Sequence, residues 1–316
     1  MNLFGNILTY TAPSANYRGE GTLNRAVIQK VTRDRFEYAI ISPESMRNAL
    51  RETLRSLGLP CNRERLENEE QLAVRFQDYP DADKYADDFF MGWLIAASTS
   101  DRKKIFDDLK QKGRDPAQFR FKGDTVLRMN MAVALEPYRH DSVFTQSPLN
   151  VDSPWKNADN SQLLHRETSV TAFQYPFALN LEDCKPKQEW TRILLQAIGQ
   201  LNDVAGNHAR SYYEMAPASI LVRLTNQLVA GFDIYGFSIG NDGTHKHTEV
   251  VDGILYSTVK NGVKVDNPDY PASEFYLGGK IVKDMDESIF IALQNKGVHM
   301  DRNPQRLLAQ IAAEIF

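Results

Sequence analysis

The segment from Ser42 to Pro60 constrains the fold of this chain more than any other stretch, because its helix has an explicit beginning and end. Ser42 is a favourable N-cap residue, and Pro43 suits the first helical position. Gly58 and Pro60 end the helix. Between these limits, residues at helical spacing form one stripe that must be buried: Met46, Ala49, Leu50, Thr53, Leu54 and Leu57. We therefore predict an amphipathic helix packed on a core.

Three stretches before this helix are alternating, β-branched or aromatic, and predict strands: Leu3–Thr11, Ala26–Val31 and Phe36–Ile41. An opening of strand, loop, two strands and helix indicates an α+β sandwich of ferredoxin-like type. Further strands are predicted over Phe89–Ala97, Thr125–Leu135, Ser169–Leu181 and Ala218–Leu224, and helices over Pro186–Asn202 and Pro304–Ile315. The charged stretch 61–86, which contains Pro80 and directly follows Pro60, predicts a helical insertion.

Composition excludes several classes of protein. Hydrophobic residues at 42% and charged residues at 25% are typical of a globular chain. Two distant cysteines without His at zinc spacing argue against a disulfide framework and a structural zinc, and favour the reducing cytoplasm. The longest apolar run, Phe89–Ala97, is too short to span a membrane. The first residues lack the pattern of a signal peptide, so we expect an intracellular protein.

The sequence contains no motif of a metallohydrolase, nucleotide-binding protein or serine hydrolase. His245 and His247 flank Lys246 in a turn, but without a third ligand we expect an exposed hairpin rather than a metal site. Asp87 and Asp88 precede an apolar stretch, and such a pair more often ends a strand in water than holds a cation. We predict no catalytic residue, no metal and no cofactor.

Positive charge is concentrated in the first part of the chain. The net charge is −4, yet residues 1–65 hold 10 Lys/Arg against 6 Asp/Glu. Arg47, Arg51 and Arg55 recur at intervals of four and form a second stripe on the helix. A solvated face is the commonest fate of such a stripe, but a polyanion would relieve the repulsion between like charges. Together with Arg18 and Arg25, the stripe predicts a surface that binds phosphates.

The segment S-P-E-S-M-R-N-A-L-R from Ser42, preceded by P-S-A-N-Y-R-G-E-G-T-L-N-R, resembles the backbone subunit of CRISPR Cascade complexes. This is the seventh Cas protein family, and the resemblance is to its DevR branch in the RAMP superfamily. Ser42, Glu44, Arg47 and Arg51 occupy the places of the family signature. Three later stretches, starting at Asp87, His165 and Gly206, are similar to the same family and follow in family order.

The resemblance implies an RRM-like palm over 1–54 and 87–316, a helical finger insertion over 55–86, and a thumb-like loop at about 149–166. It implies RNA contacts from Arg18, Asn24, Arg25, Ser42, Arg47, Arg51, Met91, Gly92, Asn207, His208 and Arg210. Glu44 departs from the Gln of several relatives, and a carboxylate beside phosphate is unfavourable. We expect Glu44 to stabilise the helix N-terminus instead.

The function implied is that of a non-catalytic, guide-RNA-binding backbone subunit of a type I Cascade, of the I-B branch. Copies would stack head to tail along the crRNA, with other Cascade subunits, and present the guide to target DNA. One alternative is an RNA-cleaving, type III-like subunit, but Thr11–Leu23 contains no Asp and only Glu20 as an acid. The other alternative is a DevR-type transcriptional autoregulator, which the negative charge and the lack of a helix-turn-helix disfavour.

Overall fold

The computed structural model describes residues 1–14, 25–67, 72–146, 163–202, 204, 214–256, 258–261, 263–265 and 268–316. The chain divides into two compact units. Met1–Thr53 and Met129–Phe316 form the first unit, and Leu54–Arg128 form the second. The first unit is thus built from both ends of the chain, and the second is inserted between them.

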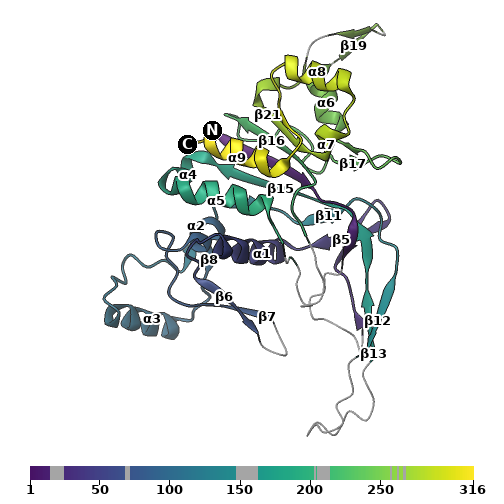
Figure 1. The fold of residues 1–316 in the computed structure, drawn as a ribbon. Helices are drawn as coiled ribbons and strands as arrows, with labels where there is room; N and C mark the ends of the chain where they lie inside the picture. Colours follow the sequence, from purple (N-terminus) through teal and green to yellow (C-terminus); the bar gives the residue numbers. More distant parts are fainter. Residues whose placement is uncertain are drawn as a thin grey trace. The chain divides into compact units, whose positions relative to one another are not determined.

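The first unit contains one large sheet, helices and several small sheets (Figure 1). The strands of the large sheet are β1 (Asn2–Leu8), β4 (Lys30–Arg33), β5 (Phe36–Ile41), β11 (Ala132–Ala134), β15 (Phe173–Asn180), β16 (Ser219–Thr225), β21 (Phe275–Gly279) and β22 (His299–Asp301). The helices are α1 (Pro43–Ser56, whose last turn enters the second unit), α4 (Leu181–Cys184), η1 (Lys185–Lys187), α5 (Gln188–Gly199), α6 (Thr248–Leu255), η2 (Ala272–Glu274), α7 (Lys280–Lys283), α8 (Glu287–Asn295) and α9 (Pro304–Glu314). The small strands are β2 (Ala12–Ser14), β3 (Arg25–Ala26), β12 (Ser142–Gln146), β13 (Leu163–Glu167), β14 (Ser169–Thr171), β17 (Ser238–Ile239), β18 (His245–Lys246), β19 (Thr258–Lys260) and β20 (Val263–Val265).

The strand order of the large sheet places the first strand of the chain in its interior. The order is β22-β21-β16-β1-β15-β11-β5-β4. β1 pairs antiparallel with β15 and with β16, so that Asn6 lies opposite both Pro176 and Leu221. The centre of the sheet is therefore made by segments far apart in the sequence.

Helices cover one face of this sheet (Figure 1). Leu3, Ile7 and Tyr175 on this face are fully buried. α9 packs so closely on β21 that a Cβ on Gly278 would lie 2.7 Å from the Leu307 side chain. α5 packs beside α9. These helices have the amphipathic pattern predicted from the sequence, and Asn303 caps α9 as expected.

The segment 226–298 covers the opposite face. Leu8, Leu221 and Leu277 of the sheet share one apolar cluster with side chains from the segment 226–298. The members from that segment are Phe232, Phe237, Val250, Ile254, Leu255, Phe275, Ile281, Val282, Leu293 and Val298. No role was predicted for 226–316, and the structure makes this segment part of the core.

The second unit differs in secondary structure from the prediction. Its elements are β6 (Arg63–Glu67), β7 (Leu72–Phe76), α2 (Ala86–Met91), β8 (Trp93–Leu94), α3 (Thr99–Gln111), β9 (Lys122–Gly123) and β10 (Leu127–Met129, whose last residue belongs to the first unit). Where the sequence predicted a helical insertion, β6 and β7 form an antiparallel hairpin. Where it predicted one strand over Phe89–Ala97, α2 is followed by β8. A short apolar run does not distinguish a helix from a strand, and two acidic residues in the first turn favour the helix.

The remaining elements follow the sequence more closely. The predictions of α1, α5, α9, β15 and β16 are confirmed. The predicted strand Thr125–Leu135 is divided into β10 and β11. The mixed α+β class is confirmed. In the part of the chain that the structure describes, every helix is too short or too polar to traverse a bilayer.

Candidate nucleic-acid interface

Ser42 begins α1 as an N-cap, as its sequence context predicted. Its hydroxyl oxygen accepts a hydrogen bond from the Ser45 N–H at 3.3 Å and lies 3.2 Å from the Ser45 hydroxyl. Its carbonyl accepts from the Met46 N–H at 3.1 Å. Glu44 is exposed in the first turn, where the helix dipole favours a negative charge.

The three arginines predicted to form one stripe have different environments. Arg47 is half-buried, and its Nε is covered but makes no hydrogen bond to any residue that the structure describes. Arg51 is only 5% exposed and donates from Nη1 to Asn48 Oδ1 at 2.9 Å. Arg55 lies in the second unit, where its guanidinium donates to the main-chain oxygen of Arg63. The stripe is therefore not a uniformly solvated face, because Arg51 borders the buried apolar stripe.

Met91 and Gly92 lie in the second unit, and packing accounts for both. Met91 is buried at the end of α2. Gly92 ends that helix with φ +62°, and a Cβ there would lie 2.4 Å from the Gly123 carbonyl oxygen. A side chain at position 92 would be strained both by its backbone angle and by this contact.

Asp87 and Asp88, which the sequence predicted to lie in water, are two buried carboxylates that form a cluster near Gly92. Asp87 accepts from the N–H groups of Asn62 at 2.6 Å and Arg63 at 3.1 Å. Asp88 Oδ2 accepts from Asn62 Nδ2 at 2.8 Å and from the Asp81 N–H at 3.0 Å. Both aspartates are completely buried.

Arg63 neutralises part of this charge. Its guanidinium lies 3.7 Å from Asp87 Oδ2 and 3.3 Å from Asp88 Oδ1, and it also donates to the Gly92 carbonyl. Burial raises the pKa of Asp88, and the charge of Asp87 acts in the same direction. The cluster joins the base of the β6–β7 hairpin to α2. The sequence signal was the pair Asn62–Arg63, whose side chains complement two adjacent acids.

A small sheet in the first unit contains an aromatic pair, Phe144 and His165, in register with the backbone of Arg25. β13 pairs antiparallel with β12 and parallel with β3, so that His165 lies opposite both Phe144 and Arg25. Phe144 is 60% exposed, and its ring lies 4.2 Å from the His165 ring. An exposed aromatic ring such as that of Phe144 is a typical platform for an unpaired base. The sequence analysis did not select these two residues, whose only signal was strand alternation.

Glu167 fixes the base of this sheet. Its carboxylate accepts from the Ile28 N–H at 3.1 Å and from Lys30 Nζ at 3.2 Å. Burial alone would raise the pKa of Glu167, but these hydrogen bonds and the charge of Lys30 outweigh it, so the pKa is lowered.

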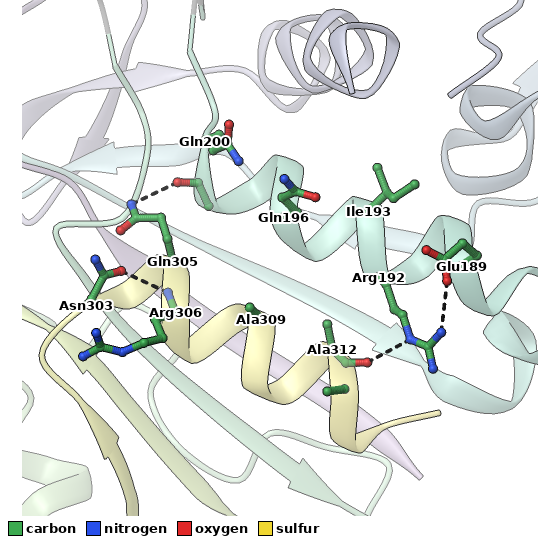
Figure 2. Close-up of a pocket in the computed structure, with 12 residues that line it drawn as sticks. Glu189, Arg192, Ile193, Gln196, Gln200, Asn303, Gln305, Arg306, Ala309 and Ala312 are labelled. Atoms are coloured by element: carbon green, nitrogen blue, oxygen red, sulfur yellow. Dashed lines mark hydrogen bonds and ion pairs between the residues drawn. The ribbon is translucent and has the colours of Figure 1, made fainter. Parts of the chain in front are cut away.

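A groove of about 670 Å³ between α5 and α9 also carries arginines, but both are engaged (Figure 2). Arg192 donates to Glu189 at 3.0 Å and to the main-chain oxygen of Phe316 at 2.7 Å. Arg306 forms two bonds to Asp301, at 2.5 and 2.6 Å. This groove therefore offers little to a phosphate.

The remaining predicted contacts lie outside the described residues. These are Arg18, Asn24, Asn207, His208 and Arg210, together with the central part of the predicted thumb, 149–162. For Arg25 the structure describes the backbone position alone. Of the predicted contacts that the structure describes, Ser42, Arg47 and Arg51 belong to the first unit. Met91 and Gly92 belong to the second unit.

Comparison with known proteins gives one curated relative that matches over most of its length. The chain is 28% identical over 294 residues to "CRISPR-associated protein Cas7/Cst2/DevR" of Myxococcus xanthus (strain DK1622), covering 90% of this chain and 88% of the relative. The resemblance predicted from the sequence motifs is confirmed. No protein-family model matches the chain.

Solved structures agree in fold. The chain superposes with a TM-score of 0.56 and 11% identity on a chain of a "CRISPR RNA-guided surveillance complex", with complete coverage of both chains. A second chain, from a complex described as "pre-nicking", gives a TM-score of 0.56 at 12% identity, again with complete coverage. At this identity the likeness establishes the fold.

Proposed function

We propose that this chain is a guide-RNA-binding subunit of a CRISPR-associated surveillance complex. The observation that carries the proposal is the match to the CRISPR-associated relative over nine-tenths of the chain. The fold likeness to chains of RNA-guided surveillance complexes, complete over both chains, supports the same function.

The strand order supports an RRM-like palm. In chain order, β1, α1, β11, β15, α5 and β16 repeat the strand–helix–strand pattern of a ferredoxin-like domain, and β16-β1-β15-β11 has the matching antiparallel order. The face opposite α5 and α9 is filled by the segment 226–298. RNA would therefore bind at the loops and edges, near the start of α1 and along β12 and β13.

The chemistry of these edges suits a protein that binds every guide. Arg47 and Ser42 would contact the phosphate backbone, which carries no sequence information. Phe144 and His165 would stack on an unpaired base without choosing its identity. Sequence is then read by base pairing between the guide and target DNA.

The subunit would have a structural rather than a catalytic role. The first loop, Thr11–Leu23, contains no Asp that could serve a metal-dependent nuclease. We place the chain in a type I complex of the I-B branch, where copies extend head to tail together with other subunits. A heterologous contact of this kind does not close and continues until RNA or a partner ends it.

The direct test is to co-express the chain with a CRISPR array transcript, purify it, and size and sequence the bound RNA. We expect discrete RNAs derived from repeat and spacer, recovered intact after incubation with Mg²⁺. Arg302→Ala removes an exposed arginine that is far from α1 in sequence. This variant is the control for the loss of one positive charge outside α1. Heterogeneous cellular RNA, no RNA, or specific cleavage of the guide would contradict the proposal.

Assembly is tested by deleting Asn150–Ser161 from the predicted thumb. We expect the variant to bind short RNA as a monomer and to form no multi-subunit particles on long guides. Light scattering measures the particle mass with and without guide. Normal assembly of the deletion variant would show that the thumb is elsewhere.

A further inference from the structure

Glu167 joins three segments of the first unit that are far apart in sequence. Its Oε2 accepts from the Ile28 N–H at 3.1 Å and from Lys30 Nζ at 3.2 Å, and its Oε1 lies 4.0 Å from His140 Nε2. The Lys30 ammonium group in turn lies 4.1 Å from the centre of the Tyr138 ring. One carboxylate therefore connects the end of β13 to the start of β4 and to the segment that precedes β12.

This carboxylate lies on the side of β13 that carries the aromatic pair. Residues two apart on a strand point to the same side, so Glu167 and His165 share a face. Phe144 lies directly opposite His165 on β12. Only 9% of the Glu167 side chain is exposed, whereas Phe144 is 60% exposed. A buried acid and an exposed ring thus belong to one face of this small sheet.

The segment 25–30, which Glu167 contacts, is anchored more strongly at its end than at its start. At its end, Ile28 is only 3% exposed, and the Gln29 carbonyl accepts a main-chain N–H of β5 at 2.9 Å. At its start, β3 is joined to β13 by a parallel pairing of two residues, in which Arg25 lies opposite His165. Parallel pairing is slightly less stable per residue than antiparallel pairing. The carboxylate bonds at the boundary between these two parts.

We propose that Glu167 is a positioning residue for RNA binding. Its carboxylate keeps the backbone of Arg25 in register with Phe144 and His165, so that a phosphate contact and a stacking contact act on one RNA strand together. The inference rests on the proposed RNA-binding function and assigns no contact with RNA to Glu167 itself. A surface that is ordered before RNA arrives binds more tightly, because less conformational freedom is lost on binding.

Charge alone predicts the opposite effect of removing Glu167, so the sign of the change tests the proposal. RNA is a polyanion, and removing a carboxylate near its binding surface should strengthen binding. The substitution would also release the Lys30 ammonium group from its ion pair. A positioning role predicts weaker binding in spite of both gains.

Glu167→Gln is the first variant to measure. Glutamine keeps an oxygen that can accept from the Ile28 N–H but lacks the charge that pairs with Lys30. We expect the variant to bind a short single-stranded RNA about twofold to tenfold more weakly at pH 7, which corresponds to the cost of ordering one long side chain. Fluorescence anisotropy measures the affinity at a temperature where thermal denaturation shows the variant to be folded. Unchanged or tighter binding would overturn the proposal.

Glu37→Gln is the matched control for charge. Glu37 is an exposed acid of the same unit, on β5 opposite Thr32 of β4. We expect the affinity of this variant for RNA to be unchanged or slightly higher. A loss equal to that of Glu167→Gln would show that the position of the acid is irrelevant, and would overturn the proposal.

A double-mutant cycle with Arg25→Ala separates positioning from a general loss of structure. If Glu167 acts through the segment that carries Arg25, Glu167→Gln should change the affinity of the Arg25→Ala protein by less than about twofold. The salt dependence of binding should fall by about one unit of slope in each single variant and no further in the double variant. Additive losses would show independent effects and would overturn the proposal.

Hydrogen exchange measured by mass spectrometry reports the order of the segment 25–30 without RNA. Peptides that cover it should exchange faster in Glu167→Gln than in the wild type, while peptides from β1 and β16 remain protected. Equal exchange of the segment would overturn the proposal. A wild type that binds no RNA would overturn both the proposed function and this inference. Normal binding by the wild type with unchanged affinity in Glu167→Gln would overturn the inference alone.

Discussion

Arg47 and Arg63 are both partly buried arginines, yet the two regions that hold them use the guanidinium in opposite ways. Arg63, at the base of the β6–β7 hairpin, meets Asp87, Asp88 and the Gly92 carbonyl. Arg47, on α1, has a covered Nε without a hydrogen bond to the described residues. The comparison teaches that a basic residue near a predicted site is informative only once its partners are known. Arg63 is part of the structure, whereas Arg47 Nε is covered without such a partner among the described residues.

The largest expected effect is on the Arg63 side of the comparison. Asp87→Ala removes two hydrogen-bond acceptors and leaves Arg63 undercompensated, which should lower the free energy of unfolding by about 3–5 kcal/mol. Urea denaturation measures the change. Asp107→Ala, an exposed acid on α3, is the control and should change stability by less than about 0.5 kcal/mol. A small effect of Asp87→Ala would mean that the cluster is not structural.

Gly92→Ala tests the same cluster through the backbone. Its φ of +62° and the contact of 2.4 Å with the Gly123 oxygen should together cost about 2–4 kcal/mol. Gly113→Ala is a matched control in the same unit, because its φ is +71° but a Cβ would have no atom within 4 Å. We expect the control to cost about 1–2 kcal/mol. Equal losses in the two variants would show that the contact at position 92 is unimportant.

The comparison extends to buried carboxylates, for which the direction of the pKa shift sets the pH dependence. Because the pKa of Glu167 is lowered on folding, its contribution is present above the unfolded value of 4.5 and is lost as the pH falls through the folded value. Glu167→Gln should therefore reduce stability at pH 7 and make progressively less difference below about pH 4. For Asp88, whose pKa is raised on folding, the sign is opposite: its contribution to stability increases as the pH falls. Denaturation midpoints of the wild type and Glu167→Gln between pH 3 and 7 check the sign, and a constant difference would refute it.

The smallest effect on stability and the most specific effect on binding are expected at Arg47. Arg47→Ala should leave the unfolding midpoint nearly unchanged but reduce the salt dependence of RNA binding by about one unit of slope, for all sequences alike. Adding Arg51→Ala should bring the reduction to about one to two units and also lower stability, because Arg51 is buried and bonded to Asn48. Fluorescence anisotropy at several salt concentrations, with Arg302→Ala as control, measures the slope. Sequence-selective loss would argue against backbone contact.

Sequence reasoning succeeded where a local rule determines the structure. Ser42 and Asn303 begin helices because each caps its own first turn, and α5 was visible from its apolar spacing. It failed where the determinant lies elsewhere in the chain. α2 was taken for a strand because nothing local shows that Asp87 and Asp88 are held by Asn62 and Arg63.

The candidate site shows the same division. The start of α1 was predictable from the order of Ser, Pro and Arg residues, whereas the burial of Arg51 depends on tertiary packing. The pairing of Phe144 with His165 depends on a strand register that connects two distant segments. The sequence predicted an exposed hairpin for His245 and His247, but both are buried. His245 Nδ1 lies 2.8 Å from the Ser219 hydroxyl, and His247 packs against Phe232 and Phe237, so their burial likewise depends on other segments.

The position of β1 has a consequence for the synthesis of the chain. Its partners β15 and β16 begin at residues 173 and 219, so the centre of the sheet closes only after most of the protein has been made. At about 5–20 residues per second, roughly 10–35 s pass before β15 follows β1 from the ribosome. During that time an apolar strand, with Leu3, Ile7 and Leu8, is without its native neighbours. The order of translation thus leaves β1 open to aggregation until β15 and β16 have been made.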